Sequence, residues 1–485
     1  MTTNNWQPNL TQKRVLAKLN RQKILLLGAG REGLSTYIFL REQFPKMRLM
    51  VADQQSRLKL SSAWKKYLAH DPYLMGSFGK HYLNCVTNST YIFKTPGIPL
   101  TIPQLQTFLQ RGGIISSQTE CFFKLARGKI IGITGTKGKS TIVSLIAHTL
   151  SFAKKPVLLM GNIGTPPLSM ISQTTHRTLS VLELSAHQLQ DLHTSPHIGV
   201  LQNITSEHLD YYPNLQAYQN AKSSLVRYQK SSDYLIYCDE FAISRQFAQL
   251  SKAQLLPFGL KDQVSHRAFV DRQAIYYRPQ QGQPQAIAII KRKQLKLLGK
   301  HNLYNIMPAI IIGKHFGLTD ECLAQALASF TPLRHRLELV GNYQDVTYIN
   351  DSLSTTPQAA VAALKIFHGR PIYLLAGGFE RRQNYQILAK QILTQNVPAV
   401  ILFPTTGKRI KQTIIDLAIA KKQLAPDFYH VNTMPEALKI CQKLVKPGSI
   451  VLLSPAAASF DSFKDYADRG NQFCHEVAKM QQRQK

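Results

Sequence analysis

Residues 130–141, Ile-Ile-Gly-Ile-Thr-Gly-Thr-Lys-Gly-Lys-Ser-Thr, constrain the fold of this chain more than any other stretch. They begin with apolar residues typical of a buried strand and pass through a glycine-rich turn. They end where an apolar pattern with helical spacing begins at Ile142. In a strand–loop–helix of this kind, the backbone N–H groups and the helix dipole favour an anion. Lys139 adds a positive charge, and Ser140 or Thr141 can hold Mg²⁺ against phosphate oxygens.

The loop therefore predicts a binding site for a nucleoside triphosphate. The strict phosphate-loop pattern has glycine at the position of Ile133, and here Gly132 and Gly135 flank that position. A plain flexible turn does not explain why Gly-Lys-Ser-Thr stands at the start of a helix. The predicted phosphate-binding residues are Gly135, Thr136, Lys137, Gly138, Lys139, Ser140 and Thr141.

Length and composition set broader limits. The 485 residues suggest two to four domains, and 44% hydrophobic with 18% charged residues is typical of a globular chain. Six scattered cysteines without a Cys-x-x-Cys pair predict neither a zinc site nor a disulfide scaffold. The N-terminus lacks the apolar core of a signal peptide, and no apolar run approaches the ~20 residues that span a bilayer. We expect a cytoplasmic protein without a membrane partner.

The formal net charge of +32 is extreme. It is compatible with anionic substrates, with non-specific attraction to nucleic acid, or with a proteome that is basic throughout. The basic residues are scattered apart from a short cluster at 291–296, and no pattern of aromatic residues on basic strands indicates RNA binding. We expect no nucleic-acid partner.

The pattern along the chain predicts an α/β protein with three units. Each unit alternates strands with helices, which favours parallel sheets. A break at residues 330–336 reads as a hinge, and we expect a helix at 303–316 and β-rich structure within 234–300. Strands are predicted at 23–27, 48–53, 86–94, 156–160, 179–183, 198–202, 346–350, 371–376, 399–403 and 449–454.

The first unit contains Gly28-Ala-Gly30-Arg31-Glu-Gly33, a dinucleotide fingerprint, and Asp53 stands where an acid that binds ribose would follow. Taken alone, this pattern suggests NAD or FAD. The same glycines would equally suit the diphosphate of a UDP-type substrate, and a second nucleotide site downstream makes hydride transfer less necessary.

Further polar residues follow predicted strands or open helices. Glu183 ends a strand and suits a Mg²⁺ ligand. His208 and Lys222 come after the next strand, in the order expected along one rim of an active site. Asn302 and Asn305 are three residues apart, so their amides share a helix face; N-capping by Asn302 is the alternative. Further along, Arg334 and Arg336 suit phosphate, and Asp351 suits a ribose.

The order of these motifs resembles the Mur ligases, ATP-dependent enzymes that add amino acids to peptidoglycan precursors, and among them most the branch that adds glutamate. The resemblance covers nearly the whole chain. It rests on the series Gly135–Thr141, Gly161–Gly164, Glu183–Ser185, His208, Ala221–Lys222, His301–Asn302, Asn305, His335–Arg336, Asn350–Ser352, Ser454–Ser459, Phe463–Lys464 and Arg469–Gly470.

The resemblance implies a Rossmann-like UDP-substrate domain at residues 1–120, a P-loop ATPase-like domain at 121–332 and a Rossmann-like amino-acid domain at 333–485. It implies a monomer that uses ATP and two Mg²⁺ ions to form an acyl phosphate of UDP-N-acetylmuramoyl-L-alanine, which glutamate then attacks. Three small molecules, UDP-sugar, ATP and glutamate, would be its only partners.

The resemblance also implies a role for individual residues. Lys139, His208 and Lys222 would be catalytic, and Ser140, Glu183, His208 and a carbamylated Lys222 would hold the metal ions. Asn302, Arg336 and Asp351 would join the phosphate loop in binding ATP. Gly28, Gly30, Arg31, Asp53 and Asn162 would contact the UDP-substrate, and Thr355, Arg381, Ser459, Phe460 and Tyr466 the glutamate.

Three positions depart from the family pattern. Lys137 stands where asparagine is frequent, Leu353 where the glutamate-adding branch has lysine, and Arg381 or Arg382 where it has another lysine. D-glutamate is the expected substrate, and L-glutamate is an open alternative. A folylpolyglutamate synthase would lack the unit that contains Gly28. An NAD-dependent oxidoreductase leaves Lys139 unexplained, and a nucleic-acid-dependent ATPase rests on charge alone.

Overall fold

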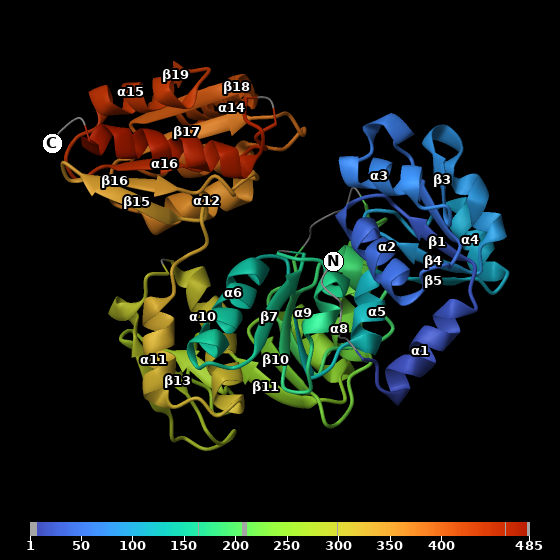
Figure 1. The fold of residues 1–485 in the computed structure, drawn as a ribbon. Helices are drawn as coiled ribbons and strands as arrows, with labels where there is room; N and C mark the ends of the chain where they lie inside the picture. Colours follow the sequence, from blue (N-terminus) through green and yellow to red (C-terminus); the bar gives the residue numbers. More distant parts are fainter. Residues whose placement is uncertain (1–6, 163, 206–210, 298, 461, 483–485) are drawn as a thin grey trace. The chain divides into compact units, whose positions relative to one another are not determined.

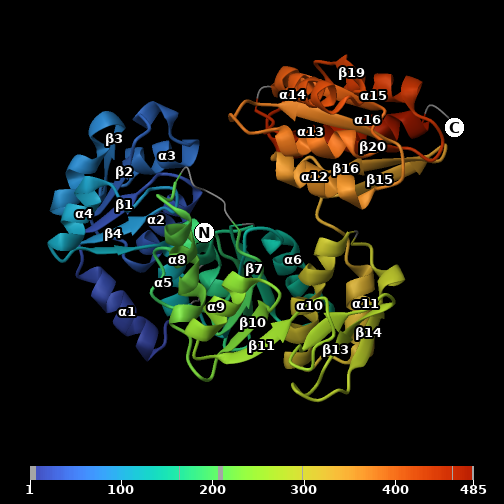
Figure 2. The same cartoon turned by 180° about the vertical axis from the view of Figure 1, so that it is seen from behind.

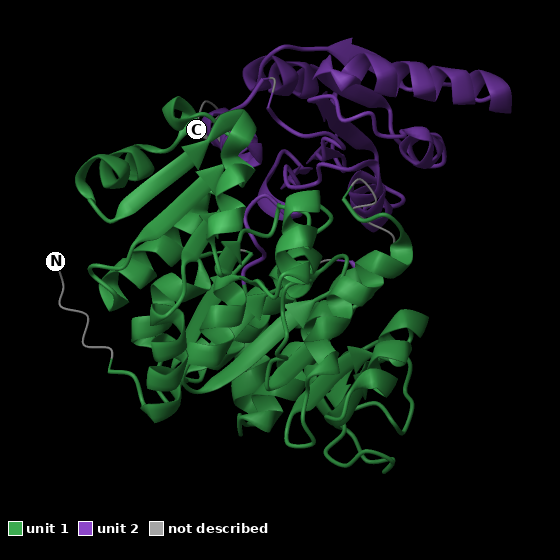
Figure 3. Cartoon of the chain, turned by 90° about the vertical axis from the view of Figure 1, so that its right-hand side faces the viewer, with its two compact units in different colours: residues 1–295, 300–330 green, residues 296–299, 331–485 purple. Residues whose placement is uncertain are grey.

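The computed structural model describes residues 7–162, 164–205, 211–297, 299–460 and 462–482. It divides into two compact units, which Figure 3 shows in green and purple. The first comprises Met1–Leu295 with Lys300–Phe330, and the second Lys296–Gly299 with Thr331–Lys485. The main division at Thr331 lies beside the predicted boundary at 332. The boundary at 120 falls inside the first unit and remains a prediction.

The first unit contains two sheets, and the sheet nearer the N-terminus is entirely parallel, with the order β3-β2-β1-β4-β5. Its central strand, Ile-Leu-Leu-Leu, is buried along its whole length. Figure 1 labels helices α2 and α3 and strands β1, β3, β4 and β5, and Figure 2 labels β2. The bounds are α1 Leu10–Asn20, β1 Ile24–Leu27, α2 Arg31–Gln43, β2 Leu49–Asp53, η1 Arg57–Lys59, α3 Ser62–His70, β3 Leu74–Phe78, η2 Gly79–Asn88, β4 Tyr91–Lys94, α4 Pro103–Gln110, β5 Ile114–Ser116 and α5 Gln118–Leu125.

The predicted strand at 86–94 is wrong in its first half. Residues Gly79–Asn88 form a 3₁₀ helix, and the strand begins only at Tyr91. Side-chain hydroxyls explain the difference: Thr87 donates to the carbonyl of Asn84, and Ser89 to that of Cys85. Such local bonds compete with strand pairing and favour a helical turn.

The second sheet has nine strands in the order β14-β13-β12-β11-β10-β9-β6-β8-β7. Strands β6 to β12 are all parallel to their neighbours among these strands. Strands β12, β13 and β14 form an antiparallel meander. The bounds are β6 Lys129–Thr134, α6 Lys139–Phe152, β7 Val157–Gly161, η3 Pro167–Gln173, β8 Leu179–Glu183, α7 Ala186–Leu189, β9 Ile198–Leu201, α8 Leu215–Arg227, β10 Tyr234–Cys238, α9 Ala242–Leu250, β11 Gln254–Phe258, β12 Ala268–Val270, β13 Ala274–Tyr277, β14 Ile287–Lys291, η4 Arg292–Gln294, α10 Lys300–His315 and α11 Asp320–Ser329.

Hydrophobic burial explains why β6 lies within this sheet rather than at its edge. Its Ile130, Ile131 and Ile133 are buried, and α6 covers the sheet with a stripe that includes Ile142 and Leu145. A strand flanked on both edges and covered by a helix needs apolar residues on both faces. The predicted strands at 156–160, 179–183 and 198–202, the helix near 303–316 and the β-rich segment after 234 are all confirmed.

The second unit contains a six-stranded sheet, β15-β16-β20-β17-β18-β19. Strand β15 pairs antiparallel with β16, and the other neighbours are parallel. One apolar cluster packs under α12, α13 and α14 and another under α15 and α16, the helices that Figures 1 and 2 show around this sheet. The bounds are β15 Glu338–Tyr343, β16 Val346–Asn350, α12 Pro357–Ile366, β17 Ile372–Gly378, α13 Gln386–Leu393, β18 Ala399–Thr405, α14 Thr406–Lys421, β19 Asp427–His430, α15 Met434–Leu444, β20 Ile450–Leu453 and α16 Tyr466–Gln482.

The four strands predicted after the hinge are confirmed, and the three-unit α/β pattern corresponds to the three sheets. The prediction omitted the edge strands β15 and β19. Both are polar or partly exposed: Leu339 in β15 is 62% exposed, and β19 reads Asp-Phe-Tyr-His. Within the described ranges, no helix is long and apolar enough to cross a membrane.

Candidate functional site

The predicted phosphate loop lies between the end of β6 and the start of α6. Gly135 and Gly138 have φ angles of +159° and +87°, a region that side chains disfavour. Gly138 is the N-cap of α6 and supplies no side-chain hydrogen bond to the first turn. The cap residue therefore does not occupy the N–H groups of that turn, and a helix N-terminus of this kind favours an anion.

Two lysines converge on this loop. Lys139 Nζ donates to the carbonyls of Gly135 and Thr136, each at 2.9 Å. From α8, the buried Lys222 donates to the same Gly135 carbonyl at 3.0 Å and to Thr134 Oγ1 at 3.2 Å. Sequence reasoning placed both lysines at the site, and the structure brings them together. Both side chains thus contact the same carbonyl oxygen of the phosphate loop.

Glu183 ends β8, next to the strand that leads into the loop. It is paired in register with Ile133 and is 2% exposed. Its Oε1 accepts a 2.8 Å hydrogen bond from Asn162 Nδ2, so the predicted metal ligand and the predicted substrate contact lie together. Among the described residues, Glu183 Oε2 has no hydrogen-bond partner although it is buried, and the same holds for Thr141 Oγ1.

A buried carboxylate oxygen without a donor needs a cation or a proton. Mg²⁺ prefers oxygen ligands such as a carboxylate and the hydroxyl of Ser140, so Glu183 fits the predicted metal site. Over the described ranges, no group of three or more His, Cys, Asp or Glu side chains is placed to hold a metal ion. His208 lies outside the described residues, so the second predicted ion stays a prediction.

Helix α10 closes the other side of the loop. Asn305 Nδ2 donates to Asn302 Oδ1 at 2.8 Å, which confirms that the two amides share a face. Asn302 lies inside the first turn of α10 rather than at its cap. A Cβ on Gly138 would lie 2.4 Å from Asn305 Oδ1, so the helix packs directly on the loop. Gln202, which donates to Asn305 Oδ1 at 3.2 Å, was not singled out in the sequence.

The glycine fingerprint of the first sheet forms a second loop. Gly28 follows β1 with φ +105°, and Gly33 packs so closely that a Cβ would lie 2.0 Å from the Gly28 carbonyl oxygen. Both carboxylate oxygens of Asp53 accept backbone N–H groups, from Ala29 at 2.7 Å and from Gln55 at 2.8 Å. Asp53 therefore fixes the backbone of the glycine loop. Arg31 is the first residue of α2, the helix that follows this loop.

The loop after β4, Thr95–Pro99, packs against the glycine loop, and the sequence did not single it out as part of a site. Thr95 N donates to the Leu27 carbonyl at 2.9 Å, and a Cβ on Gly28 would lie 2.1 Å from Thr95 Oγ1. The loop after β4 thus forms one wall of the glycine loop. Its Pro-Gly pair could have been interpreted as a loop that approaches a ligand.

In the second unit, Asp351 lies after β16 and is buried. Ser454 Oγ donates to its Oδ2 at 2.8 Å and the Leu337 N–H to its Oδ1 at 3.2 Å. Burial raises the pKa of this carboxyl to about 6, because the charged form loses its hydration. Arg336 lies one residue before Leu337, at the end of the predicted hinge and two residues before β15.

Of the predicted glutamate contacts, Arg381 and Phe460 are brought together. The guanidinium carbon lies 5.6 Å from the ring centroid, and Phe460 is 57% exposed. The buried Ser459 is its neighbour. Tyr466, at the start of α16, packs 6.2 Å from the ring of His335, and Thr355 accepts a 3.0 Å bond at its carbonyl from Gln383.

Arg469 is a functional candidate that the motif series includes without a role. It is fully buried and, within the described residues, forms no ion pair. Its guanidinium donates to the carbonyl of Ser352 at 2.9 Å and to that of Ala457 at 3.2 Å. Burial lowers the pKa of this side chain to about 9. Arg469 thereby ties the loop that bears Asp351 to the loop that bears Ser459.

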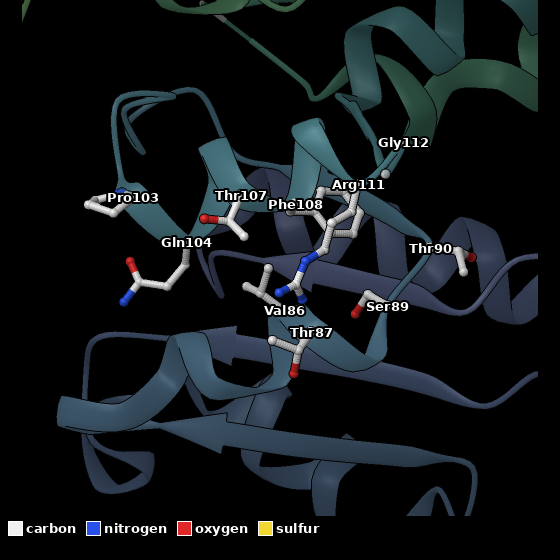
Figure 4. A pocket seen from close by; sticks show the side chains of 11 residues that line it. Val86, Thr87, Ser89, Thr90, Pro103, Gln104, Thr107, Phe108, Arg111 and Gly112 are labelled. Atoms are coloured by element: carbon white, nitrogen blue, oxygen red, sulfur yellow. The ribbon is translucent and has the colours of Figure 1, made fainter.

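A surface cavity of about 440 Å³ lies away from these residues (Figure 4). Arg111 reaches between η2 and α4 above Val86 and Thr87. The cavity borders the segments that precede β4 and β5, so it opens at the amino ends of the parallel strands. The glycine loop lies at their carboxyl ends. No predicted site residue lines it.

Comparisons with known proteins follow the same division of the chain. Residues 133–313 match the family "Mur ligase middle domain", and residues 335–457 match "Mur ligase, glutamate ligase domain". The chain is 33% identical over 390 residues to the UDP-N-acetylmuramoylalanine–D-glutamate ligase of Geobacillus kaustophilus, covering 80% of this chain and 83% of that protein. It is 29% identical over 465 residues to the protein of that name from Koribacter versatilis, covering 96% and 99%.

A solved structure shares the fold. The MurF ligase of Thermotoga maritima, determined in complex with ADP, superposes with a TM-score of 0.55 at 15% identity, covering 96% of this chain and 97% of that one. The two proteins therefore share their fold over nearly the whole of both chains.

Gly138→Ala tests whether the loop geometry serves ligand binding. The new Cβ would meet Asn305 Oδ1 in a φ region that alanine disfavours, so the loop must shift. Loss of one or two charge-assisted hydrogen bonds should weaken binding of a Mg·ATP analogue at least about tenfold, measured by calorimetry.

The control is Gly112→Ala. Its φ of +81° is similar, but no atom lies within 4 Å of the added Cβ. Both variants should lose about 1 kcal/mol of folding stability from the strained backbone. Only Gly138→Ala should lose nucleotide binding. Equal affinity in the two variants would refute the assigned role of the loop.

Proposed function

The chain belongs to the Mur ligase family, and we propose that it is the ATP-dependent ligase that joins D-glutamate to UDP-N-acetylmuramoyl-L-alanine in peptidoglycan precursor synthesis. One observation carries the proposal: Lys139, Lys222 and the buried Glu183 carboxylate surround a phosphate loop in a chain whose relatives bear that name. An NAD-dependent oxidoreductase would not explain why two lysines and a buried carboxylate surround a phosphate loop. We further propose a cytoplasmic location, where both nucleotide substrates are available.

We assign one substrate to each sheet. The proposed domains are residues 1–120 for the UDP-substrate, 121–332 for ATP and 333–485 for glutamate. The glycine loop with Gly28, Gly30 and Arg31, braced by Asp53, would face the UDP-substrate, and Asn162 would contact its sugar end. The hydrogen bond between Asn162 and Glu183 supports this, because it links the substrate contact to the phosphate site.

In the proposed reaction the alanine carboxylate of the UDP-substrate attacks the γ-phosphorus of ATP, and ADP leaves. The glutamate amine then attacks the acyl carbon, phosphate leaves, and the amine releases a proton. Lys139 and the N–H groups of α6 would neutralise charge on the phosphates. Ser140 and Glu183 would hold Mg²⁺, which, when bound, draws charge from the phosphate oxygens. Asn302, Arg336 and Asp351 would orient the nucleotide.

Arg381 supports the proposal that the second unit binds glutamate. A guanidinium can bind a carboxylate in bidentate fashion, and Arg381 lies over the exposed Phe460 beside Ser459. With arginine in place of the family's lysine, the charge is preserved while its position along the side chain changes. We infer that Arg381, Ser459 and Phe460, with Thr355 and Tyr466, form the glutamate pocket.

The decisive experiment measures phosphate release and the nucleotide product with Mg·ATP and UDP-N-acetylmuramoyl-L-alanine. D-glutamate, L-glutamate, lysine and diaminopimelate are supplied in parallel. We expect turnover with D-glutamate and at least about 100-fold less with L-glutamate. Lys139→Ala should lower kcat by about 10³-fold or more, because it removes a charge that acts on the transferring phosphoryl group.

Turnover that does not require the UDP-substrate would refute the proposed function. Turnover with L-glutamate alone would leave the proposed reaction class unchanged. It would show that the enzyme selects the L-enantiomer, and we would attribute that selectivity to the changes at Leu353 and Arg381. Stimulation by DNA or RNA, lost at high salt, would favour a nucleic-acid-dependent ATPase instead.

We also propose that Lys222 is carbamylated in the active enzyme. The neutral amine would add to CO₂ and lose a proton, so a cation becomes an anion able to hold Mg²⁺ with His208. The position of Lys222 supports this, because its buried Nζ lies at the phosphate loop, 3.0 Å from the Gly135 carbonyl oxygen.

Labelling with ¹³C-bicarbonate should give a protein-bound carbonyl resonance that Lys222→Arg lacks. Exhaustive removal of CO₂ should lower kcat, and bicarbonate should restore it. Lys137→Arg provides a control lysine on the loop, and it should keep the resonance. Full activity without CO₂, together with no difference between the labelled spectra, would contradict carbamylation.

A further inference from the structure

A ten-residue segment after Glu183 connects the two sheets of the first unit. We call residues 185–194, which include α7, the bridging segment. Its polar groups contact α2, β4 and α5. Gln188 Nε2 donates to Glu32 Oε1 at 2.9 Å, Asp191 pairs with Lys94 at 2.8 Å, and the His193 N–H donates to Glu120 Oε2 at 2.9 Å.

The Lys94–Asp191 pair is the most buried of these contacts. The two side chains are 0% and 1% exposed. Besides Asp191, Lys94 Nζ donates to the carbonyl oxygens of Ile98 at 2.8 Å and Thr95 at 3.3 Å. The ammonium group thus makes hydrogen bonds to two carbonyl oxygens, and Asp191 supplies the counter-charge. The pair therefore does more than join two sheets, because it also fixes the backbone of the Thr95–Ile98 loop.

The same loop is held from a second side. Tyr211 Oη lies 3.2 Å from the Pro96 carbonyl oxygen and 3.1 Å from that of Ile98, and it accepts a 2.8 Å hydrogen bond from Gln190 Nε2 of the bridging segment. Two side chains thus connect the Thr95–Ile98 loop to the bridging segment. On its other side, Thr95 packs against Gly28 of the glycine loop.

A purely structural role does not explain this choice of residues. Two apolar side chains of similar volume would hold a buried interface at least as well as an ion pair does. They could not donate to the carbonyls of Thr95 and Ile98. A buried lysine with a matched aspartate satisfies those carbonyls and sets the loop position at once.

We propose that Lys94 and Asp191 are positioning residues that fix the Thr95–Ile98 loop, and with it the nucleotide-sugar substrate, relative to Glu183 and the phosphate loop. The inference rests on the proposed function. Its physical basis is alignment: the carboxylate of the bound substrate must meet the γ-phosphorus, and a small displacement of one partner costs rate.

The test compares single and double variants. Lys94→Met and Asp191→Leu each leave one charge buried alone, so both should lower the melting temperature. The double variant Lys94→Met/Asp191→Leu removes both charges and should regain most of that loss. If the pair only holds the sheets together, activity should return with stability.

We expect stability to return without full activity. In the double variant, KM for UDP-N-acetylmuramoyl-L-alanine should rise at least about tenfold and kcat should fall, while KM for ATP stays within about twofold. Wild-type kcat and KM for the UDP-substrate in a stable double variant would overturn the proposal. Should the double variant fail to fold, Lys94→Gln/Asp191→Asn, which also removes both charges but keeps polar side chains, takes its place with the same criteria.

Glu120→Gln is the matched control. Glu120 also contacts the bridging segment, through His193 and Thr194, but no contact of its carboxylate reaches the Thr95–Ile98 loop. This variant should lose stability while KM for the UDP-substrate stays unchanged. A rise in that KM equal to the rise in the double variant would show that any loosening of the interface suffices, and would overturn the specific role of the pair.

Hydrogen exchange gives a readout independent of activity. The amides of Thr95 and Ile98, which donate to Leu27 and Thr95, should exchange faster in the double variant than in the wild type and in Glu120→Gln. If the wild type ligates no substrate but this exchange difference holds, the proposed function fails and the positioning of the loop stands. Unchanged exchange would refute the positioning.

Discussion

The Gly135 carbonyl, with two lysine side chains on it, is the constraint around which the phosphate site is built. Lys139 and Lys222 both donate to this oxygen from different helices. Gly135 and Gly138 in this loop both have positive φ angles. Helix α10 then packs on Gly138, and the buried Glu183 carboxylate lies on the neighbouring strand. The site is thus arranged for a ligand with several negative charges and a counter-cation.

A buried cation that donates to backbone carbonyls is also found at each of the other two sheets. Lys94 holds the carbonyls of Thr95 and Ile98 after β4, and Arg469 holds those of Ser352 and Ala457 after β16 and β20. In each sheet a buried cation fixes loops at the carboxyl ends of parallel strands, where ligands of α/β sheets bind. Lys94 has Asp191 as its counter-charge, whereas Arg469 donates to carbonyl and hydroxyl oxygens and forms no ion pair among the described residues.

Sequence reasoning was strongest where local chemistry decides structure. Buried strands such as β6 and β17 and the loop from Gly135 to Gly138 follow from apolar runs and glycine placement. It missed the edge strands β3, β5, β15 and β19, and it was wrong at residues 86–88, where side-chain hydroxyls favour a 3₁₀ turn. Asp53 as a brace and the Lys94–Asp191 pair could not be foreseen, because each depends on partners 24 to 97 residues away that only the tertiary fold brings together.

The most direct test of the account asks whether the phosphate loop activates a carboxylate on the UDP-substrate. The enzyme is incubated with Mg·ATP, UDP-N-acetylmuramoyl-L-alanine and hydroxylamine, with no glutamate present, and the hydroxamate of the substrate is quantified. The account predicts that the hydroxamate forms with the wild type, in step with ADP, and that Lys139→Ala abolishes both. ADP formation without any hydroxamate, in an enzyme that ligates D-glutamate under the same conditions, would contradict an acyl phosphate formed at this loop.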